Sequence, residues 1–184
     1  VCLPFMMAGK LLGIPIVVHE QNSLPGITTR IGAAWAKAVF YSFPQSLEYF
    51  RSRGEIAYSG NPVKKGLGTV DKAEALVILN LDPAKKTLLV FGGSQGAATL
   101  NKSVNEVIGE ITDRYNLIWG CGKGNKPEKI PQGAVVMEFI DDMNAVYSAA
   151  DLAITRAGAM TLAELAAVGL PAVLVPFPYA AEDH

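Results

Sequence analysis

Strand-like and helix-like segments alternate along the whole of this 184-residue chain. Short runs of Val, Ile, Leu and Phe favour strands, and longer stretches between them carry apolar residues at helical spacing. Alternation of this kind requires right-handed crossovers between parallel strands, with helices on both faces of the sheet. The pattern predicts an α/β fold with strands at residues 14–18, 39–43, 56–58, 88–91, 116–119, 135–139, 152–155 and 172–175.

The predicted helices lie between these strands, and one more precedes them. They cover residues 29–37, 72–80, 97–110, 144–149 and 161–168. The apolar segment 3–12 is compatible with contact to a membrane surface, but we expect an ordinary core helix, because apolar side chains are usually buried. Pro4, Lys10 and Pro15 interrupt the apolar residues here, so no stretch reaches the ~20 residues that span a membrane.

A break in the pattern at Gly60-Asn61-Pro62 and a glycine-rich stretch up to Gly68 indicate a linker. We expect residues 1–62 to be the C-terminal part of one domain and residues 63–184 to be most of a second. The chain opens on a valine rather than a methionine and stops in a polar stretch. It is therefore interpreted as a fragment in which both domains are incomplete.

Charge and cysteine content exclude several classes of function. The formal net charge of −1 argues against nucleic-acid binding, which normally requires a basic face. The two cysteines, Cys2 and Cys121, are far apart and do not form a disulfide framework, which favours a reducing compartment. No His or Cys cluster has the spacing of metal ligands, so we expect no metal and no cofactor.

The glycine-rich turn at residues 92–96 bears most directly on function. It follows the apolar run Leu88 to Phe91 and precedes an Ala-rich helical segment. N–H groups at such a helix start attract phosphate, and glycine lets a ligand approach the backbone. The turn matches neither G-x-G-x-x-G nor the Walker motif. A tight turn without a ligand is therefore equally compatible with this segment alone.

A second strand-to-helix turn, at residues 156–164, allows two interpretations. Thr161 and Glu164 have the spacing of a capping box, in which Thr161 caps the helix and Glu164 reaches back to its N–H. Alternatively, the helix start faces a diphosphate and Glu164 accepts hydrogen bonds from two sugar hydroxyls. From the residues alone, capping is the favoured interpretation.

Two adjacent pairs of titratable residues also follow predicted strands, where ligands bind in parallel α/β sheets. His19 and Glu20 are candidates for an acid–base pair, but successive strand side chains face opposite ways, which favours structural roles. Asp141 and Asp142 are candidates for a divalent metal site, yet helix capping explains adjacent acids before a helix more simply.

Six segments, taken together and in this order, resemble the MurG family of glycosyltransferases (glycosyltransferase family 28). They are residues 19–26, 60–63, 92–97, 139–143, 156–164 and 169–177. The resemblance extends over the whole chain, and six motifs in register are more specific than either turn alone. It implies a GT-B architecture, in which two Rossmann-like domains with parallel sheets face each other across a cleft.

The resemblance also implies a reaction. Such an enzyme transfers N-acetylglucosamine, with inversion, from UDP-N-acetylglucosamine to the C4 hydroxyl of undecaprenyl-linked lipid I. The product, lipid II, serves peptidoglycan synthesis, and with it cell wall biogenesis, cell shape and cell division. The resemblance places the enzyme peripherally on the cytoplasmic face of the bacterial membrane. It implies metal-independent diphosphate binding, with helix N-termini supplying the positive field.

The family's donor-binding residues can be carried over motif by motif. Ser94 would contact the diphosphate, and Ile140 would meet the uracil edge through its backbone. Asn22 would face the sugar side of the cleft. Lys64 stands where the family often has Arg, and a lysine can meet a phosphate but lacks the bidentate fork. The helix start around phosphate and ribose, with Glu164 on the ribose hydroxyls, would comprise Ala159, Met160, Thr161, Leu162, Ala163 and Glu164.

Other parts of the family pattern would fall outside this sequence. The N-terminal glycine-rich loop, with the His proposed near the acceptor, would precede Val1, and the Gln-rich segment that reads the donor sugar would follow His184. We therefore expect the isolated polypeptide to be inactive and its parent to be a transferase. Two alternatives stay open: another GT-B enzyme such as a diacylglycerol glycosyltransferase, and a non-catalytic UDP-binding module, against which Ser94 and Glu164 speak.

Overall fold

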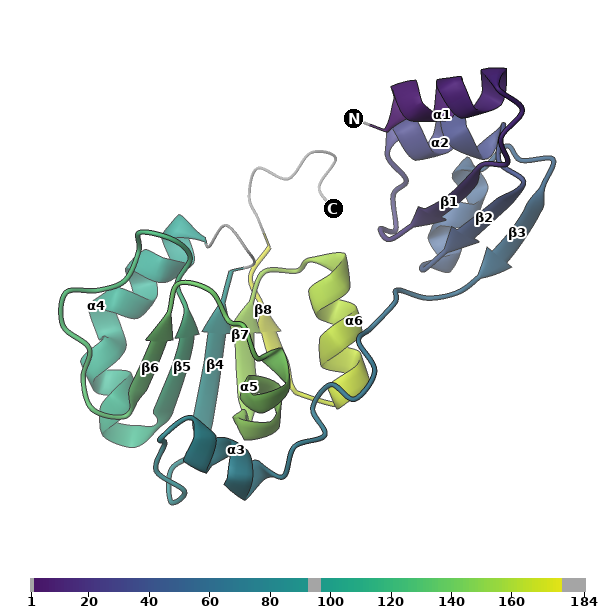
Figure 1. The fold of residues 1–184 in the computed structure, drawn as a ribbon. Helices are drawn as coiled ribbons and strands as arrows, with labels where there is room; N and C mark the ends of the chain where they lie inside the picture. The colour runs from purple at the N-terminus through teal and green to yellow at the C-terminus, as the bar shows by residue number, and fades with distance from the viewer. Residues whose placement is uncertain (1, 93–96, 177–184) are drawn as a thin grey trace. The chain divides into compact units, whose positions relative to one another are not determined.

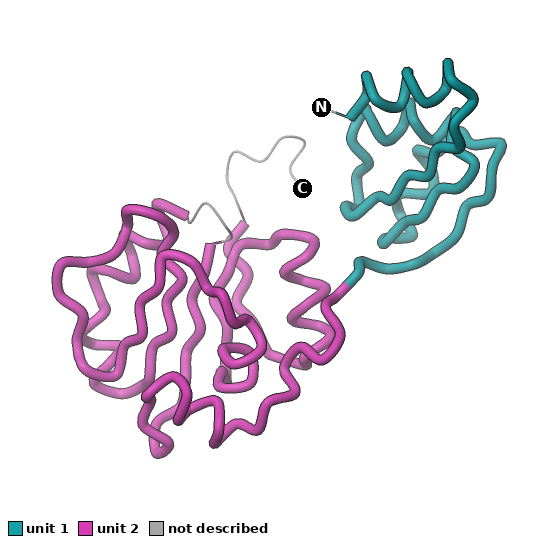
Figure 2. The backbone as a smooth tube through the Cα atoms, in the orientation of Figure 1, with its two compact units in different colours: residues 1–62, 178–184 teal, residues 63–177 magenta. Residues whose placement is uncertain are grey.

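The computed structural model describes residues 2–92 and 97–176. These residues fall into two compact units that divide between Pro62 and Val63 (Figure 1, Figure 2). Each unit contains one β-sheet, and every strand pair in both sheets is parallel. The α/β class predicted from the alternation of strands and helices is confirmed.

The first unit is a three-stranded sheet in the order β1-β2-β3, with short helices between its strands. The hydrophobic core beneath the sheet is small and consists of Ala33, Ala36, Val39 and Phe50. The elements are α1 (Leu3–Leu11), β1 (Val17–Glu20), α2 (Ile27–Ala33), β2 (Ala38–Tyr41), the 3₁₀ helix η1 (Pro44–Tyr49) and β3 (Glu55–Tyr58).

Helix α1 is present where predicted, but the expectation that it is a core helix is wrong. None of its residues is buried, and Phe5 and Leu11 are 78% and 85% exposed. Helix α1 instead lies alongside α2 and contacts it (Figure 1). Its Lys10 ammonium lies 4.2 Å from the centre of the Trp35 ring. No helix in the described part of the chain combines the length and apolar character needed to cross a membrane.

The second unit is a five-stranded sheet in the order β6-β5-β4-β7-β8. Its strands are β4 (Thr87–Phe91), β5 (Asn116–Gly120), β6 (Ala134–Met137), β7 (Leu152–Thr155) and β8 (Ala172–Leu174). Its helices are α3 (Lys72–Ile78), α4 (Ala98–Arg114), α5 (Met143–Ala149) and α6 (Ala159–Val168). These elements coincide with the predicted ones to within a few residues, whereas η1 was not predicted.

Alternate side chains of the central strands are buried on opposite faces of this sheet. Leu89 and Ile118 pack into the cluster that contains α3, α5 and α6. Val90 and Leu117 pack into the cluster that contains Leu100 and Val104 of α4. Helices therefore cover both faces, which explains why the strands read as continuous apolar runs.

Asp151, which precedes β7, joins three elements at the amino end of this sheet. Its carboxylate accepts hydrogen bonds from the N–H of Thr87 at 2.9 Å and from Lys86 at 2.9 Å, and it pairs with Lys72 of α3 at 2.8 Å. Burial by itself would raise the pKa of Asp151, but the bonds from Lys72, Thr87 and Lys86 outweigh it and lower the pKa to about 2.

We expect Asp151→Asn to destabilise the second unit by on the order of 2 kcal/mol at neutral pH. The pKa of Asp151 is lower in the folded than in the unfolded state, so its contribution is present above pH ~4 and is lost as the pH falls toward 2. Urea unfolding of the wild type and of Asp151→Asn at pH 7 and at pH 3 measures the difference in the free energy of unfolding. Glu106→Gln, in the exposed pair with Lys102, is the control and should change stability by less than about 0.5 kcal/mol. An equal effect of Asp151→Asn at both pH values would contradict the prediction.

Candidate functional site

The order of strands in the second unit creates a switch point at β4. This strand comes first along the chain, and it pairs with β5 on one side and with β7 on the other. The later strands extend the sheet in opposite directions, with β6 outside β5 and β8 outside β7 (Figure 1). In open parallel sheets, ligands bind at the carboxyl ends of the strands beside such a point.

A cavity of about 170 Å³ lies at this carboxyl edge. It is smaller than the ~300–1,000 Å³ of whole-ligand pockets, so its size suits one ring of a larger ligand. The ends of β4 and β5, the segment after β6, and helices α5 and α6 all contribute to it. Its lining residues are Phe91, Gly120, Glu138, Phe139, Ile140, Met143 and Glu164.

The structure thus brings together two of the predicted donor-binding residues, Ile140 and Glu164, which are 24 positions apart in the sequence. Ile140 packs over the end of β5 because Gly120 has no side chain. A Cβ on Gly120 would lie 2.9 Å from Ile140 Cδ1 and 3.3 Å from Phe91 Cβ. A side chain at position 120 would therefore displace Ile140, which lines the cavity.

Glu164 is hydrogen-bonded to Tyr147 of α5. The Tyr147 hydroxyl donates a hydrogen bond to Glu164 Oε2 at 2.8 Å, and its ring makes an edge-to-face contact with Phe91. Tyr147 is almost completely buried. Burial, and then the hydrogen bond to Glu164 and its negative charge, raise the pKa of Tyr147 far above its ordinary value. The phenol is therefore a neutral, fixed donor to the carboxylate.

The capping box predicted for Thr161 and Glu164 is wrong. Helix α6 begins at Ala159 with Gly158 as its N-cap, two residues before the predicted start. Gly158 has extended backbone angles (φ −75°, ψ 140°), so Thr161 lies inside the first turn and Glu164 in the second. Gly158 contributes no side-chain hydrogen bond as the N-cap. The start of α6 lies at the switch point, and the dipole of a helix favours an anion at its N-terminus.

The capping interpretation of the acidic pair is confirmed for Asp142. Its carboxylate accepts hydrogen bonds from the N–H groups of Asn144 and Ala145, at 3.0 and 3.2 Å, as the N-cap of α5. Among the described residues, no group of three His, Cys, Asp or Glu side chains is arranged to hold a metal ion.

In the first unit, His19 and Glu20 make separate hydrogen bonds at the end of β1. His19 Nε2 lies 3.0 Å from the carbonyl oxygen of Gly60, which only accepts, so the ring donates. Glu20 is buried, and its Oε1 accepts from the backbone N–H and the side-chain amide of Asn22 at 3.0 and 3.3 Å. The two candidates face different partners, which favours structural roles over an acid–base pair.

A polar network ties the ends of all three strands of this unit together. Ser42 Oγ, after β2, lies 2.7 Å from Asn61 Oδ1 and 3.0 Å from the Glu20 carbonyl oxygen. The Asn61 amide donates to the Gln21 carbonyl oxygen at 3.1 Å. Two motifs that are about 40 residues apart in the sequence, at 19–22 and 60–61, are therefore in direct contact.

Lys64, a further predicted residue, is not among the described residues that line the cavity at Ile140 and Glu164. Lys64 is exposed on the segment between β3 and α3. Ser94 lies outside the described residues. Arg156, directly after β7, donates to the carbonyl oxygens of Val175 and Pro176 at 3.3 and 2.8 Å and so links the carboxyl ends of β7 and β8.

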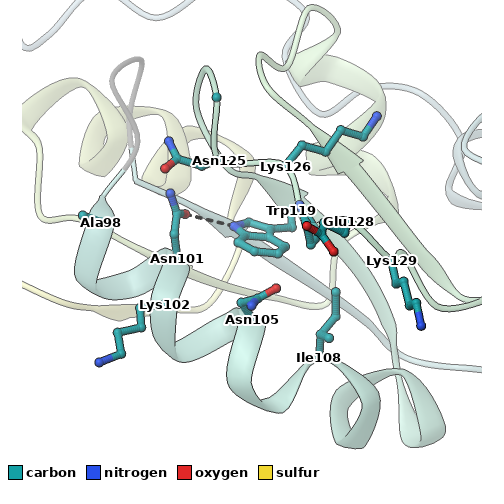
Figure 3. A pocket seen from close by; sticks show the side chains of 12 residues that line it. Ala98, Asn101, Lys102, Asn105, Ile108, Trp119, Asn125, Lys126, Glu128 and Lys129 are labelled. Carbon is teal, nitrogen blue, oxygen red and sulfur yellow. Dashed lines mark hydrogen bonds between the residues drawn. The ribbon is translucent and has the colours of Figure 1, made fainter.

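A second hollow, of about 810 Å³, lies between α4 and the loop that follows β5 (Figure 3). The Trp119 indole N–H donates to Asn101 Oδ1 at 3.1 Å and forms part of its wall. Lys102, Lys126 and Lys129 line it, but Figure 3 shows their side chains pointing away from one another. Because a ligand site needs convergent polar groups, we place the candidate site at Ile140 and Glu164.

Sequence reasoning missed six residues of the site: Phe91, Gly120, Glu138, Phe139, Met143 and Tyr147. Met143 and Tyr147 are four positions apart, so they share one face of α5, and this spacing was a usable signal. Gly120 had no local signal, because its role depends on Ile140, a side chain from another segment.

Comparison with known proteins identifies two matching families. The family described as glycosyltransferase family 28 C-terminal domain matches residues 87–184. The family described as glycosyltransferase family 28 N-terminal domain matches residues 1–41.

The chain is also similar to curated proteins that carry the name UDP-N-acetylglucosamine--N-acetylmuramyl-(pentapeptide) pyrophosphoryl-undecaprenol N-acetylglucosamine transferase. The protein of Prosthecochloris aestuarii is 41% identical over 186 residues, covering 98% of this chain and 51% of the relative. That of Idiomarina loihiensis is 42% identical over 193 residues, covering 100% and 52%. The chain thus spans about half the length of the curated relatives it matches.

Solved structures show the same relationship. Acinetobacter baumannii MurG matches with a TM-score of 0.69 and 31% identity, over 100% of this chain and 52% of that one. A UDP-glucose:anthocyanidin 3-O-glucosyltransferase in complex with UDP matches with a TM-score of 0.57 and 14% identity, over 94% and 55%, which is a likeness of fold alone. The predicted GT-B type of fold is confirmed.

We expect Tyr147 to remain protonated at pH values above the ordinary tyrosine pKa of ~10. The pKa of Tyr147 is higher in the folded than in the unfolded chain, so its contribution to stability is complete below pH ~10 and is lost as the pH rises further. Ultraviolet absorbance titration and urea unfolding at pH 8 and pH 11 measure both effects. In Tyr147→Phe the loss of stability at high pH should shrink, whereas the half-exposed control Tyr115→Phe should retain it. Ionisation of Tyr147 near the ordinary tyrosine pKa of ~10 would contradict this.

Proposed function

Because the chain belongs to glycosyltransferase family 28, we propose that it forms part of an inverting N-acetylglucosaminyltransferase. The proposed reaction transfers N-acetylglucosamine from UDP-N-acetylglucosamine to the C4 hydroxyl of lipid I and yields lipid II for peptidoglycan synthesis. The name of the curated relatives supports this donor and acceptor. The observation that carries the proposal is the meeting of Ile140 and Glu164 in one cavity at the switch point, beside the start of α6.

The donor binds along the carboxyl edge of the second unit. The uracil enters the cavity and meets the backbone of Ile140, and the ribose hydroxyls donate to Glu164. The diphosphate then lies at the start of α6, along Ala159, Met160, Thr161, Leu162 and Ala163, with Ser94 on the glycine-rich turn as a further contact. Three kinds of protein group thereby recognise three parts of the donor. The backbone of Ile140 meets the uracil, the carboxylate of Glu164 accepts from the ribose hydroxyls, and the start of α6 meets the diphosphate.

Negative charge builds up on the UDP leaving group as the glycosidic bond breaks. The backbone N–H groups and dipole of α6 stabilise that charge, and they act without rearranging because they belong to a packed helix. Inversion follows from a single in-line attack by the acceptor hydroxyl, whose proton a base removes.

We assign residues 1–62 to the acceptor and membrane side and residues 63–184 to the UDP-sugar side. Asn22 then faces the sugar and Lys64 meets a phosphate. His19 and Glu20 are weak catalytic candidates, since their hydrogen bonds to Gly60 and Asn22 hold the end of β1. The enzyme works peripherally at the cytoplasmic face of the bacterial membrane, where lipid I is available.

Two other functions compete with this one. A different GT-B enzyme, such as a diacylglycerol glycosyltransferase, would share the UDP site but accept another lipid. A non-catalytic UDP-binding module would bind UDP without transferring sugar. The identity of about 40% to the curated relatives across both units favours the lipid I acceptor.

We expect the chain to bind UDP, and Gly120→Ala to weaken that binding by about 10- to 100-fold. The added methyl group would push Ile140 into the cavity, and overpacking of this kind costs ~1–3 kcal/mol. Isothermal titration calorimetry measures the affinity. Gly109→Ala, on the exposed surface of α4 with no atoms near the new methyl group, is the matched control and should bind UDP normally. Unchanged affinity in Gly120→Ala would place the uracil elsewhere.

We also expect the 184-residue polypeptide to make no lipid II, because it spans about half the length of its transferase relatives. The full-length parent should make lipid II, and UDP should compete there with UDP-N-acetylglucosamine. Radiolabelled transfer to lipid I, with diacylglycerol as the alternative acceptor, measures both. Lipid II synthesis by the purified polypeptide would refute the first expectation, and failure of UDP to compete would refute the donor assignment.

A further inference from the structure

We propose that Tyr147 is a positioning residue of the donor site, whose hydroxyl fixes the Glu164 carboxylate in the orientation that receives the ribose hydroxyls. The inference rests on the proposed function of Glu164 and extends it to a residue on another helix. It assigns specificity for the ribose diol to a pair of side chains rather than to one.

The hydrogen bond engages one oxygen of the carboxylate and leaves the other for a ligand. Tyr147 donates to Glu164 Oε2 at 2.8 Å, and Glu164 also lines the cavity. A carboxylate has about four acceptor positions, so one bond from Tyr147 leaves enough for both hydroxyls of a ribose. The two oxygens are thus divided between the protein and the ligand.

Fixing this side chain in advance has an energetic consequence. A glutamate side chain loses rotamer entropy when it is ordered. When Tyr147 orders Glu164 before the ligand arrives, that cost no longer opposes binding. The half-buried Glu164 without Tyr147 would sample rotamers in which its carboxylate faces away from the ribose.

Tyr147 can hold Glu164 because its own position is fixed. Its ring contacts Phe91, with ring centroids 6.3 Å apart, and only 3% of the residue is exposed. The helix that carries it, α5, begins at the Asp142 cap. The orientation of the carboxylate therefore follows from the packing of α5 against the end of β4.

A purely structural role for this hydrogen bond makes a different prediction from a positioning role. A structural role changes affinity for every ligand of the site to the same degree. A positioning role changes affinity only for ligands with ribose hydroxyls, and only while Glu164 is present. The two roles are separated by changing the protein and the ligand together.

The experiment measures dissociation constants of UDP and of 2′,3′-dideoxyuridine diphosphate for the full chain and its variants by calorimetry. Wild type should prefer UDP. Tyr147→Phe should raise the dissociation constant of UDP by about 3- to 10-fold and change that of the dideoxy compound by less than ~2-fold. In Glu164→Ala the preference for UDP should disappear, and adding Tyr147→Phe should have no further effect. Tyr115→Phe, away from the cavity, is the control that should match wild type.

The outcomes separate the two proposals. If wild type does not bind UDP more tightly than the dideoxy compound, the proposed role of Glu164 at the ribose is wrong, and this inference is wrong as well. If wild type prefers UDP but Tyr147→Phe weakens both ligands equally, or weakens UDP in the Glu164→Ala background, only the inference is overturned. NMR of the ligand-free wild type is independent of how the variants fold: Glu164 should occupy one rotamer, and several rotamers would overturn the positioning role.

Discussion

The pairing of β4 on both of its edges is the constraint on which the second unit depends. Its alternate side chains are buried on both faces, and Leu89 and Val90 are completely inaccessible to solvent. Because β5 and β7 occupy its two edges, the chain must leave it in opposite directions. Because the strands are parallel, their carboxyl ends lie at the same edge of the sheet, and the cavity forms there from segments that are far apart in the sequence.

Structural and functional roles are combined in the same residues of this site. Asp142 caps α5, and α5 in turn presents Tyr147 to Glu164. Gly120 ends a buried strand and also leaves room for Ile140. A capping residue and a glycine thus help to shape the proposed uridine site. For Asp142, a structural role as a helix cap therefore does not exclude a contribution to the site, because the helix that it caps carries Tyr147.

In the first unit too, residues of the family motifs make structural hydrogen bonds. The residues at 19–22 and 60–61 resemble family motifs, and hydrogen bonds join them across the end of β2 through Ser42. Their side chains are needed to close the strand ends as well as for any contact with substrate. The resemblance located these positions, but it did not reveal that they touch. The buried Ser42 shows no motif at all, and only the parallel order β1-β2-β3 places it between them.

Local patterns sufficed for the α/β class and for most elements. The predicted strand at 152–155 coincides with β7, because a buried parallel strand is an uninterrupted apolar run. Tertiary structure alone decided that α1 lies outside the core, that Gly158 rather than Thr161 is the N-cap of α6, and that Tyr147 donates a hydrogen bond to Glu164. Periodicity records how a segment alternates between apolar and polar faces, and that is a local property. Which neighbour covers a face, or receives a hydrogen bond, depends on the order of strands in the sheet, which no single segment encodes.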